Sequence, residues 1–233
     1  SFAGEHSDIT IITPMYLGDT GRKKCTFENG IYSGAENRQI ALHKLCTIKV
    51  PFIGSRNRFC NFKADVYKGS LNGADYLFLH NDRFFSINPA AENPSGQGGC
   101  YVLNNLHIDE VERFAFLSKA VYCLLENIAT KQIKSLDLPN MLIANDWHSG
   151  AISGLTKYLT MAKVYAKRLS LDIADKLKDI PIIHIAHHMG YQGWDYNNTS
   201  KILNSLYEDL ATLVLKNAKA VKNSNPRTTN TLL

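Results

Sequence analysis

The sequence predicts an α/β protein with a Rossmann-like parallel sheet, flanking helices and an inserted β-rich segment. Strand-like and helix-like segments alternate along the chain, which favours parallel strands joined by crossover helices. The 233 residues are 45% apolar and 20% charged, enough to bury a sizeable core. No glycine period or internal repeat is present. We therefore expect one large domain over residues 1–233.

The first half of the chain predicts mainly strands. Residues 8–13 are rich in β-branched side chains and stop at Pro14, as a buried strand does. Residues 47–85 contain several short strand candidates, among them 47–51 and 75–80, split by turn signals such as Asn72-Gly73. This stretch is either an inserted lobe or a set of edge hairpins. Residues 86–105 are typical of a loop, and the glycine-rich run 95–99 lacks the lysine of a phosphate-binding loop.

The second half alternates helices and strands. A helix opens at Asp109, with Glu112 in a capping-box position, and continues to Ile128. A strand over 141–144, a helix over 149–163 and a strand over 181–186 follow, then a helix over 200–219 that runs into a short strand around 218–221. The apolar face of the first helix predicts a core position; it comprises Val111, Phe114, Ala115, Val121, Tyr122, Leu125 and Ile128.

Composition excludes several classes of protein. The net charge of +5 comes from scattered basic residues, so solvated surface charge is favoured over nucleic-acid binding. The most apolar stretch, 111–128, contains four charged residues, and no secretory signal is visible; we therefore expect a soluble protein without a membrane partner. Five widely spaced cysteines without a C-x-x-C pair indicate a reduced, intracellular compartment and no zinc site.

Polar and aromatic side chains gather after two of the predicted strands. In a parallel sheet, ligands bind beyond the carboxyl ends of the strands. If the strands over 141–144 and 181–186 are neighbours, a carboxylate, imidazoles and an amide meet in one crevice. Such groups suit sugar hydroxyls, and flat aromatic faces suit sugar rings. The candidates are Asp146, Trp147 and His148 after the first strand, and His187, His188, Tyr191 and Gln192 after the second.

Each candidate has a simpler structural interpretation. Asp146 alone could be only the N-cap of the next helix, and Trp147 alone is more typical of a core. His184, inside an apolar strand, is expected to be buried and hydrogen-bonded rather than a ligand. His187 and His188 lack a third ligand at sensible spacing, so no metal site is expected.

Two segments resemble the D-W-H and H-N-x-x-Y-Q-G motifs of bacterial glycogen synthases and plant starch synthases. Residues 143–149 read I-A-N-D-W-H-S, and residues 187–193 read H-H-M-G-Y-Q-G. The segments 12–16 (I-T-P-M-Y), 62–67 (F-K-A-D-V-Y), 82–85 (D-R-F-F) and 112–115 (E-R-F-A) resemble family segments in the same order. The resemblance therefore covers almost the whole chain.

The resemblance implies a glycosyltransferase of the two-domain GT-B architecture, of which this chain is the N-terminal, acceptor-side domain. Such enzymes transfer glucose from ADP-glucose, or less often UDP-glucose, to the non-reducing end of an α-1,4-glucan, with retention and without a metal or other cofactor. The partners expected are thus a nucleotide sugar and a glucan such as glycogen, starch or a maltooligosaccharide. The cytoplasm of a bacterium, or a plastid, is the expected location.

Residue roles follow from the same resemblance. His187 matches the histidine beside the transferred glucose, and Asp146 matches the carboxylate near the glucosyl and acceptor hydroxyls. Substrate-binding positions are expected at the remaining motif residues and at a tyrosine after the glycine-rich loop: Trp147, His148, His188, Tyr191, Gln192 and Tyr101.

The chain also departs from the family pattern. His188 replaces the family asparagine, and Ile185 replaces a threonine. The K-x-G-G-L loop that holds the nucleotide phosphates is expected upstream of Ser1, and the C-terminal domain with the donor-phosphate residues is expected beyond the chain. This chain alone is therefore expected to be inactive. Two other functions remain open: a non-catalytic glucan-binding module, and another GT-B enzyme such as a sucrose- or trehalose-related transferase.

Overall fold

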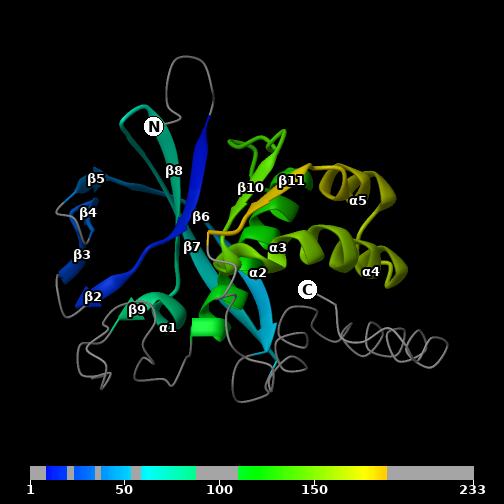
Figure 1. Ribbon diagram of the computed structural model, residues 1–233, viewed down its shortest axis with the longest axis horizontal. Helices are drawn as coiled ribbons and strands as arrows, with labels where there is room; N and C mark the ends of the chain where they lie inside the picture. The colour runs from blue at the N-terminus through cyan, green and yellow to red at the C-terminus, as the bar shows by residue number, and fades with distance from the viewer. Residues whose placement is uncertain (1–8, 20–23, 35–37, 54–58, 88–109, 188–233) are drawn as a thin grey trace.

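The computed structural model describes residues 9–19, 24–34, 38–53, 59–87 and 110–187. Within these ranges the chain forms three sheets and a group of helices. Figure 1 shows the long strands in the middle of the molecule, a small sheet on one side, and the helices with a two-stranded sheet on the other. Several predicted features lie outside the described residues: the capping residue Asp109, the glycine-rich run 95–99 and the segment 200–221.

The central sheet has the strand order β1-β8-β7-β6. Its strands are β1 (Thr10–Pro14), β6 (His43–Ile53), β7 (Phe59–Leu71) and β8 (Ala74–His80). β1 pairs in parallel with β8, whereas β8, β7 and β6 form antiparallel hairpins. The predicted β-rich segment is thus a set of edge hairpins within the main sheet. Its predicted turn is confirmed, because Asn72 and Gly73 both have positive φ (52° and 80°), as a two-residue hairpin turn requires.

The small sheet has the strand order β5-β4-β3-β2-β9. It packs through a second apolar cluster that includes Met15, Tyr32 and Phe78. β9 covers residues 86–87, which the sequence predicted as loop. Gly69 of β7 lets this sheet approach the central one, because a Cβ there would lie 2.5 Å from the carbonyl oxygen of Ala41. The strands are β2 (Leu17–Asp19), β3 (Lys24–Glu28), β4 (Ile31–Ser33), β5 (Gln39–Ala41) and β9 (Ser86–Ile87).

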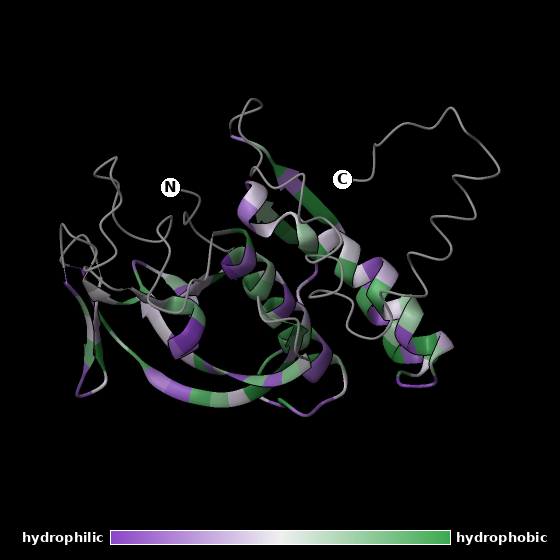
Figure 2. Cartoon of the chain, turned by 90° about the horizontal axis from the view of Figure 1, so that it is seen from below, coloured by the Kyte–Doolittle hydropathy of each residue, from purple (hydrophilic) through white to green (hydrophobic). Residues whose placement is uncertain are grey.

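Helix α2 (Glu110–Ala129) lies against the central sheet and forms much of the core. The predicted apolar face is confirmed: Phe114, Ala115, Tyr122, Leu125 and Ile128 are buried, and Val111 and Val121 are partly buried. Burial alternates along β6, where Ile48, Val50 and Phe52 are buried between less buried neighbours, and Figure 2 shows hydrophilic and hydrophobic residues mixed along the long strands.

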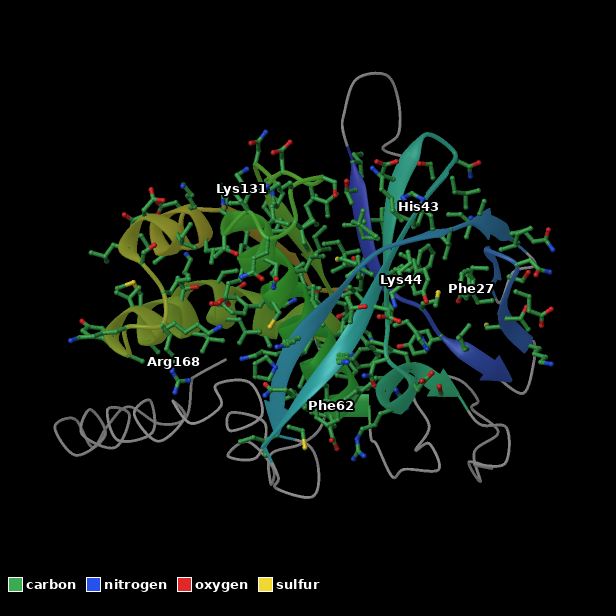
Figure 3. The ribbon with its side chains drawn as sticks, turned by 180° about the vertical axis from the view of Figure 1, so that it is seen from behind. Phe27, His43, Lys44, Phe62, Lys131 and Arg168 are labelled. Carbon is green, nitrogen blue, oxygen red and sulfur yellow. The ribbon has the colours of Figure 1, made fainter. Side chains whose placement is uncertain are left out.

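Aromatic rings fill the space between the central sheet and α2. Phe116 stacks on Phe84 of α1 (Asp82–Phe85), with ring centroids 3.8 Å apart. Phe52 meets both rings edge-on at 5.5 Å. Phe62 of β7, labelled in Figure 3, meets Phe84 edge-on at 5.2 Å and completes the cluster.

The second parallel pair is β10 (Leu142–Asn145) with β11 (Ile182–Ile185). The helical crossover between them begins at a 3₁₀ turn (Trp147–Ser149), and it encloses a π turn at Leu155–Leu159. The remaining helices of the crossover are α3 (Ala151–Gly154), α4 (Thr160–Tyr165) and α5 (Leu171–Lys178). This β-helix-β unit confirms the predicted order of elements and makes the two strands direct neighbours. Among the described residues, no helix combines the length and apolarity needed to cross a membrane.

Candidate functional site

The site lies at the carboxyl ends of β10 and β11. In the parallel register, Asn145 pairs with Ile185, so the residues that follow both strands emerge at the same edge. The backbone N–H of Asp146 donates to the carbonyl of Ile185 at 2.7 Å and extends the pairing beyond β10. The two strands are neighbours, as a shared crevice requires, so Asp146 and His187 follow adjacent strand ends.

His187 contacts the end of the neighbouring strand directly. Its Nε2 lies 2.7 Å from Oδ1 of Asn145. Both side chains are exposed to solvent. Sequence reasoning gave Asn145 no role, although the residue stands inside the D-W-H segment. No signal in the sequence indicated the contact, because it depends on the pairing of β10 with β11.

Asp146 has an unusual backbone conformation. Its φ of 60° and ψ of −179° lie in a region that is essentially restricted to glycine. Its carboxylate accepts a hydrogen bond from the N–H of Trp147 at 2.9 Å and caps the 3₁₀ turn. Asp146 therefore caps the 3₁₀ turn and not the helix α3, whose N-cap position is Gly150, and the strained backbone is an additional feature that capping does not require.

His184 was expected to be buried, and that expectation is wrong: the residue is exposed. The apolar character of β11 does not imply burial, since Ile183 and Ile185 are also exposed, 49% and 40% respectively. The expected hydrogen bond is present, with Nε2 of His184 3.0 Å from the carbonyl oxygen of Asp146. His184 thus holds the strained residue from the neighbouring strand.

The aromatic residues of the D-W-H segment form a small stack. The rings of Trp147 and His148 stack at 4.3 Å, and buried Phe114 of α2 meets them edge-on at 5.1 and 4.3 Å. Trp147 is partly buried against the core, as a structural role predicts. Nδ1 of His148 lies 4.0 Å from Oδ2 of Asp146, so an imidazole and a carboxylate face each other here.

The described part of the site offers hydrogen-bonding groups rather than a metal cage. The Asp146 carboxylate lies beside the His148 imidazole, and the Asn145 amide lies beside the His187 imidazole; groups of these kinds can bind a polyhydroxylated ligand. No group of three or more potential metal ligands occurs among the described residues. Four predicted substrate-binding residues lie outside the described ranges: Tyr101, His188, Tyr191 and Gln192.

Comparison with known proteins finds a matching family model and relatives along most of the chain. The family model of the starch synthase catalytic domain matches residues 1–222. A glycogen synthase from Clostridium botulinum (strain Eklund 17B / Type B) is 32% identical over 111 residues, which are 48% of this chain and 18% of that protein. Glycogen synthase 1 from Geobacter metallireducens is 28% identical over 220 residues, 92% of this chain and 37% of that protein. The chain therefore spans well under half the length of these relatives.

A solved structure confirms the predicted fold class. The catalytic domain of starch synthase IV from Arabidopsis thaliana, bound to ADP and acarbose, superposes with a TM-score of 0.50 at 19% identity. The match covers 88% of this chain and 31% of that one. At this identity the likeness concerns the fold alone, an α/β architecture of GT-B type.

Proposed function

Because the chain belongs to the family of starch synthase catalytic domains, we propose that residues 1–233 form the N-terminal, acceptor-side domain of a glycogen or starch synthase. The reaction proposed is transfer of glucose from ADP-glucose to the non-reducing end of an α-1,4-glucan, with retention and without a metal ion or other cofactor. A second, C-terminal domain would hold the nucleotide. The two relatives described are bacterial, which supports a cytoplasmic location.

The contact between His187 and Asn145 is the observation that carries this proposal. It joins the D-W-H segment after β10 to the segment that begins at His187 after β11. The two motifs are separated by about forty residues of sequence, and a catalytic crevice requires both at one place. Asn145 and His187, the described residues that join the two segments, lie at a shared strand edge, the usual ligand position in an open parallel sheet, which supports the assignment.

The proposed roles follow from charge and reach. In the reaction the bond between glucose C1 and the donor phosphate breaks, and a bond from C1 to the acceptor hydroxyl oxygen forms. The hydroxyl proton passes to the departing phosphate. Positive charge develops on the sugar, and a carboxylate such as that of Asp146 can stabilise it. His187 binds a hydroxyl of the same sugar, while Trp147 and His148 line the acceptor side.

The acarbose and ADP bound to the Arabidopsis starch synthase support a glucan and an ADP-linked donor as ligands. The experiment that tests the proposal measures transfer of radiolabelled glucose from ADP-glucose to glycogen by the full-length protein. A parallel incubation with UDP-glucose defines the donor. We expect Asp146→Asn and His187→Gln to abolish incorporation of the label. Asn140→Ala, at an exposed position before β10, should retain it.

Two outcomes contradict the proposal. Binding of maltooligosaccharides without any transfer would assign the protein as a glucan-binding module. Transfer at wild-type rates by either site variant would remove that residue from the catalytic machinery.

A further inference from the structure

Asn145 and His187 form a cross-strand pair with a defined direction of hydrogen bonding. The atom of Asn145 that faces the ring is Oδ1, 2.7 Å from Nε2. A carbonyl oxygen only accepts hydrogen bonds, so this contact is a hydrogen bond when Nε2 of His187 carries the proton and donates it. A neutral imidazole has a single N–H, and the other ring nitrogen, Nδ1, therefore keeps its lone pair.

We propose that Asn145 is a positioning residue for His187, which holds the ring in its Nε2–H tautomer and leaves Nδ1 to accept a hydrogen bond from a sugar hydroxyl. The assignment of a sugar hydroxyl rests on the proposed function. The assignment of the tautomer is a property of the chain itself. The role also differs from that of a proton donor, because Nδ1 of the neutral ring has no proton to give.

The parallel strands give this contact its rigidity. Asn145 is the last residue of β10 and is held in register with Ile185, two residues before His187. Two further hydrogen bonds tie the same strand ends: Asp146 N–H to the Ile185 carbonyl at 2.7 Å, and His184 Nε2 to the Asp146 carbonyl at 3.0 Å. Asn145 therefore meets His187 from a strand and not from a loop, which favours a fixed ring orientation.

The tautomer can be measured directly by long-range ¹H–¹⁵N NMR of the full-length protein labelled with ¹⁵N-histidine. His187 is assigned as the signal lost in His187→Gln. Free neutral histidine populates both tautomers, so the intact pair should shift the ring to a single form with a protonated Nε2. Asn145→Leu, which removes the acceptor at similar volume, should produce a mixture of tautomers. Asn145→Asp retains an acceptor oxygen and should restore the single neutral form at a pH at which the ring is deprotonated, and Asn140→Leu is the matched surface control.

A ring of His187 protonated at Nδ1, or tautomer populations that Asn145→Leu leaves unchanged, would overturn the proposal whatever the activity. The second measurement is glucosyl transfer by the full-length protein. Loss of one hydrogen bond to a positioned group lowers kcat about two- to tenfold, and we expect this for Asn145→Leu but not for Asn140→Leu. A changed tautomer with an unchanged kcat would refute the link to the sugar. Normal transfer by His187→Gln would instead refute the proposed site while the tautomer result stands.

Discussion

The strained backbone of Asp146 can be tested by replacing the residue with alanine and with glycine. Both substitutions remove the carboxylate and its hydrogen bond to the Trp147 N–H. Alanine keeps a Cβ in a conformation with φ of 60° and ψ of −179°, whereas glycine adopts this conformation without a steric penalty. A comparison of the two variants therefore isolates the strain from the lost cap.

The expected magnitude follows from two opposing contributions. A residue held in such a region costs of order 1–3 kcal/mol. Glycine also increases the entropy of the unfolded chain, which lowers stability by about 0.4–1 kcal/mol relative to alanine. Taking the middle of each range, Asp146→Gly should be more stable than Asp146→Ala by about 1 kcal/mol.

Urea unfolding of the purified chain gives the two free energies of unfolding. Asp137 serves as the matched control, because its side chain is 98% exposed and its φ is not among the positive ones. There the order should reverse, with the glycine variant less stable than the alanine variant. An alanine variant at position 146 that equals or exceeds the glycine variant would show that the backbone of Asp146 is not strained. Under the proposed function, neither variant at position 146 transfers glucose.

Three further substitutions test the fold. Phe116→Ala removes a fully buried ring stacked at 3.8 Å on its neighbour and should lower the free energy of unfolding by about 3–5 kcal/mol; a loss below about 1 kcal/mol would contradict the packing. Gly69→Ala should destabilise by about 1–3 kcal/mol, because the new Cβ would lie 2.5 Å from the Ala41 carbonyl oxygen; an unchanged urea midpoint would show that the two sheets do not meet there. The Asp75 carboxylate, bound to Lys68 at 2.7 Å, has a pKa below its ordinary value of 3.8. A lowered pKa in the folded state contributes stability above the unfolded pKa, and this stability is lost as the pH falls through the folded pKa. Asp75→Asn should therefore flatten the decline in urea midpoint on acidification. An unchanged decline in this variant would refute the prediction.

Much of the fold was predictable because its signals are local. The apolar face of α2 repeats at helical spacing, and the Asn72-Gly73 turn depends on two adjacent residues that tolerate positive φ. The two strands of the site were predicted within one residue of their observed bounds, and their resemblance to a known family was visible in the same segments.

The site was predictable only in outline. Asp146 and His187 were identified as candidates, but nothing near them in the sequence indicated the backbone conformation of Asp146 or the bond from Asn145. Both depend on contacts with β11, about forty residues further along the chain. The burial expected of His184 was wrong for the same reason, since an apolar pattern predicts a strand but not how much of that strand is covered.

Residue pattern alone was sufficient for the two strands of the site, for the core face of α2 and for the family resemblance, because each depends on neighbours within a few positions. It did not predict the strands of the small sheet, of which β9 falls in a segment expected to be loop. Only the folded chain could align Asn145 with Ile185 and bring His187 within 2.7 Å of the Asn145 amide oxygen. The physical reason is that strand pairing joins residues that are far apart in the sequence. A shift of one residue in the register would turn the same side chains to opposite faces, and the two motifs would no longer meet.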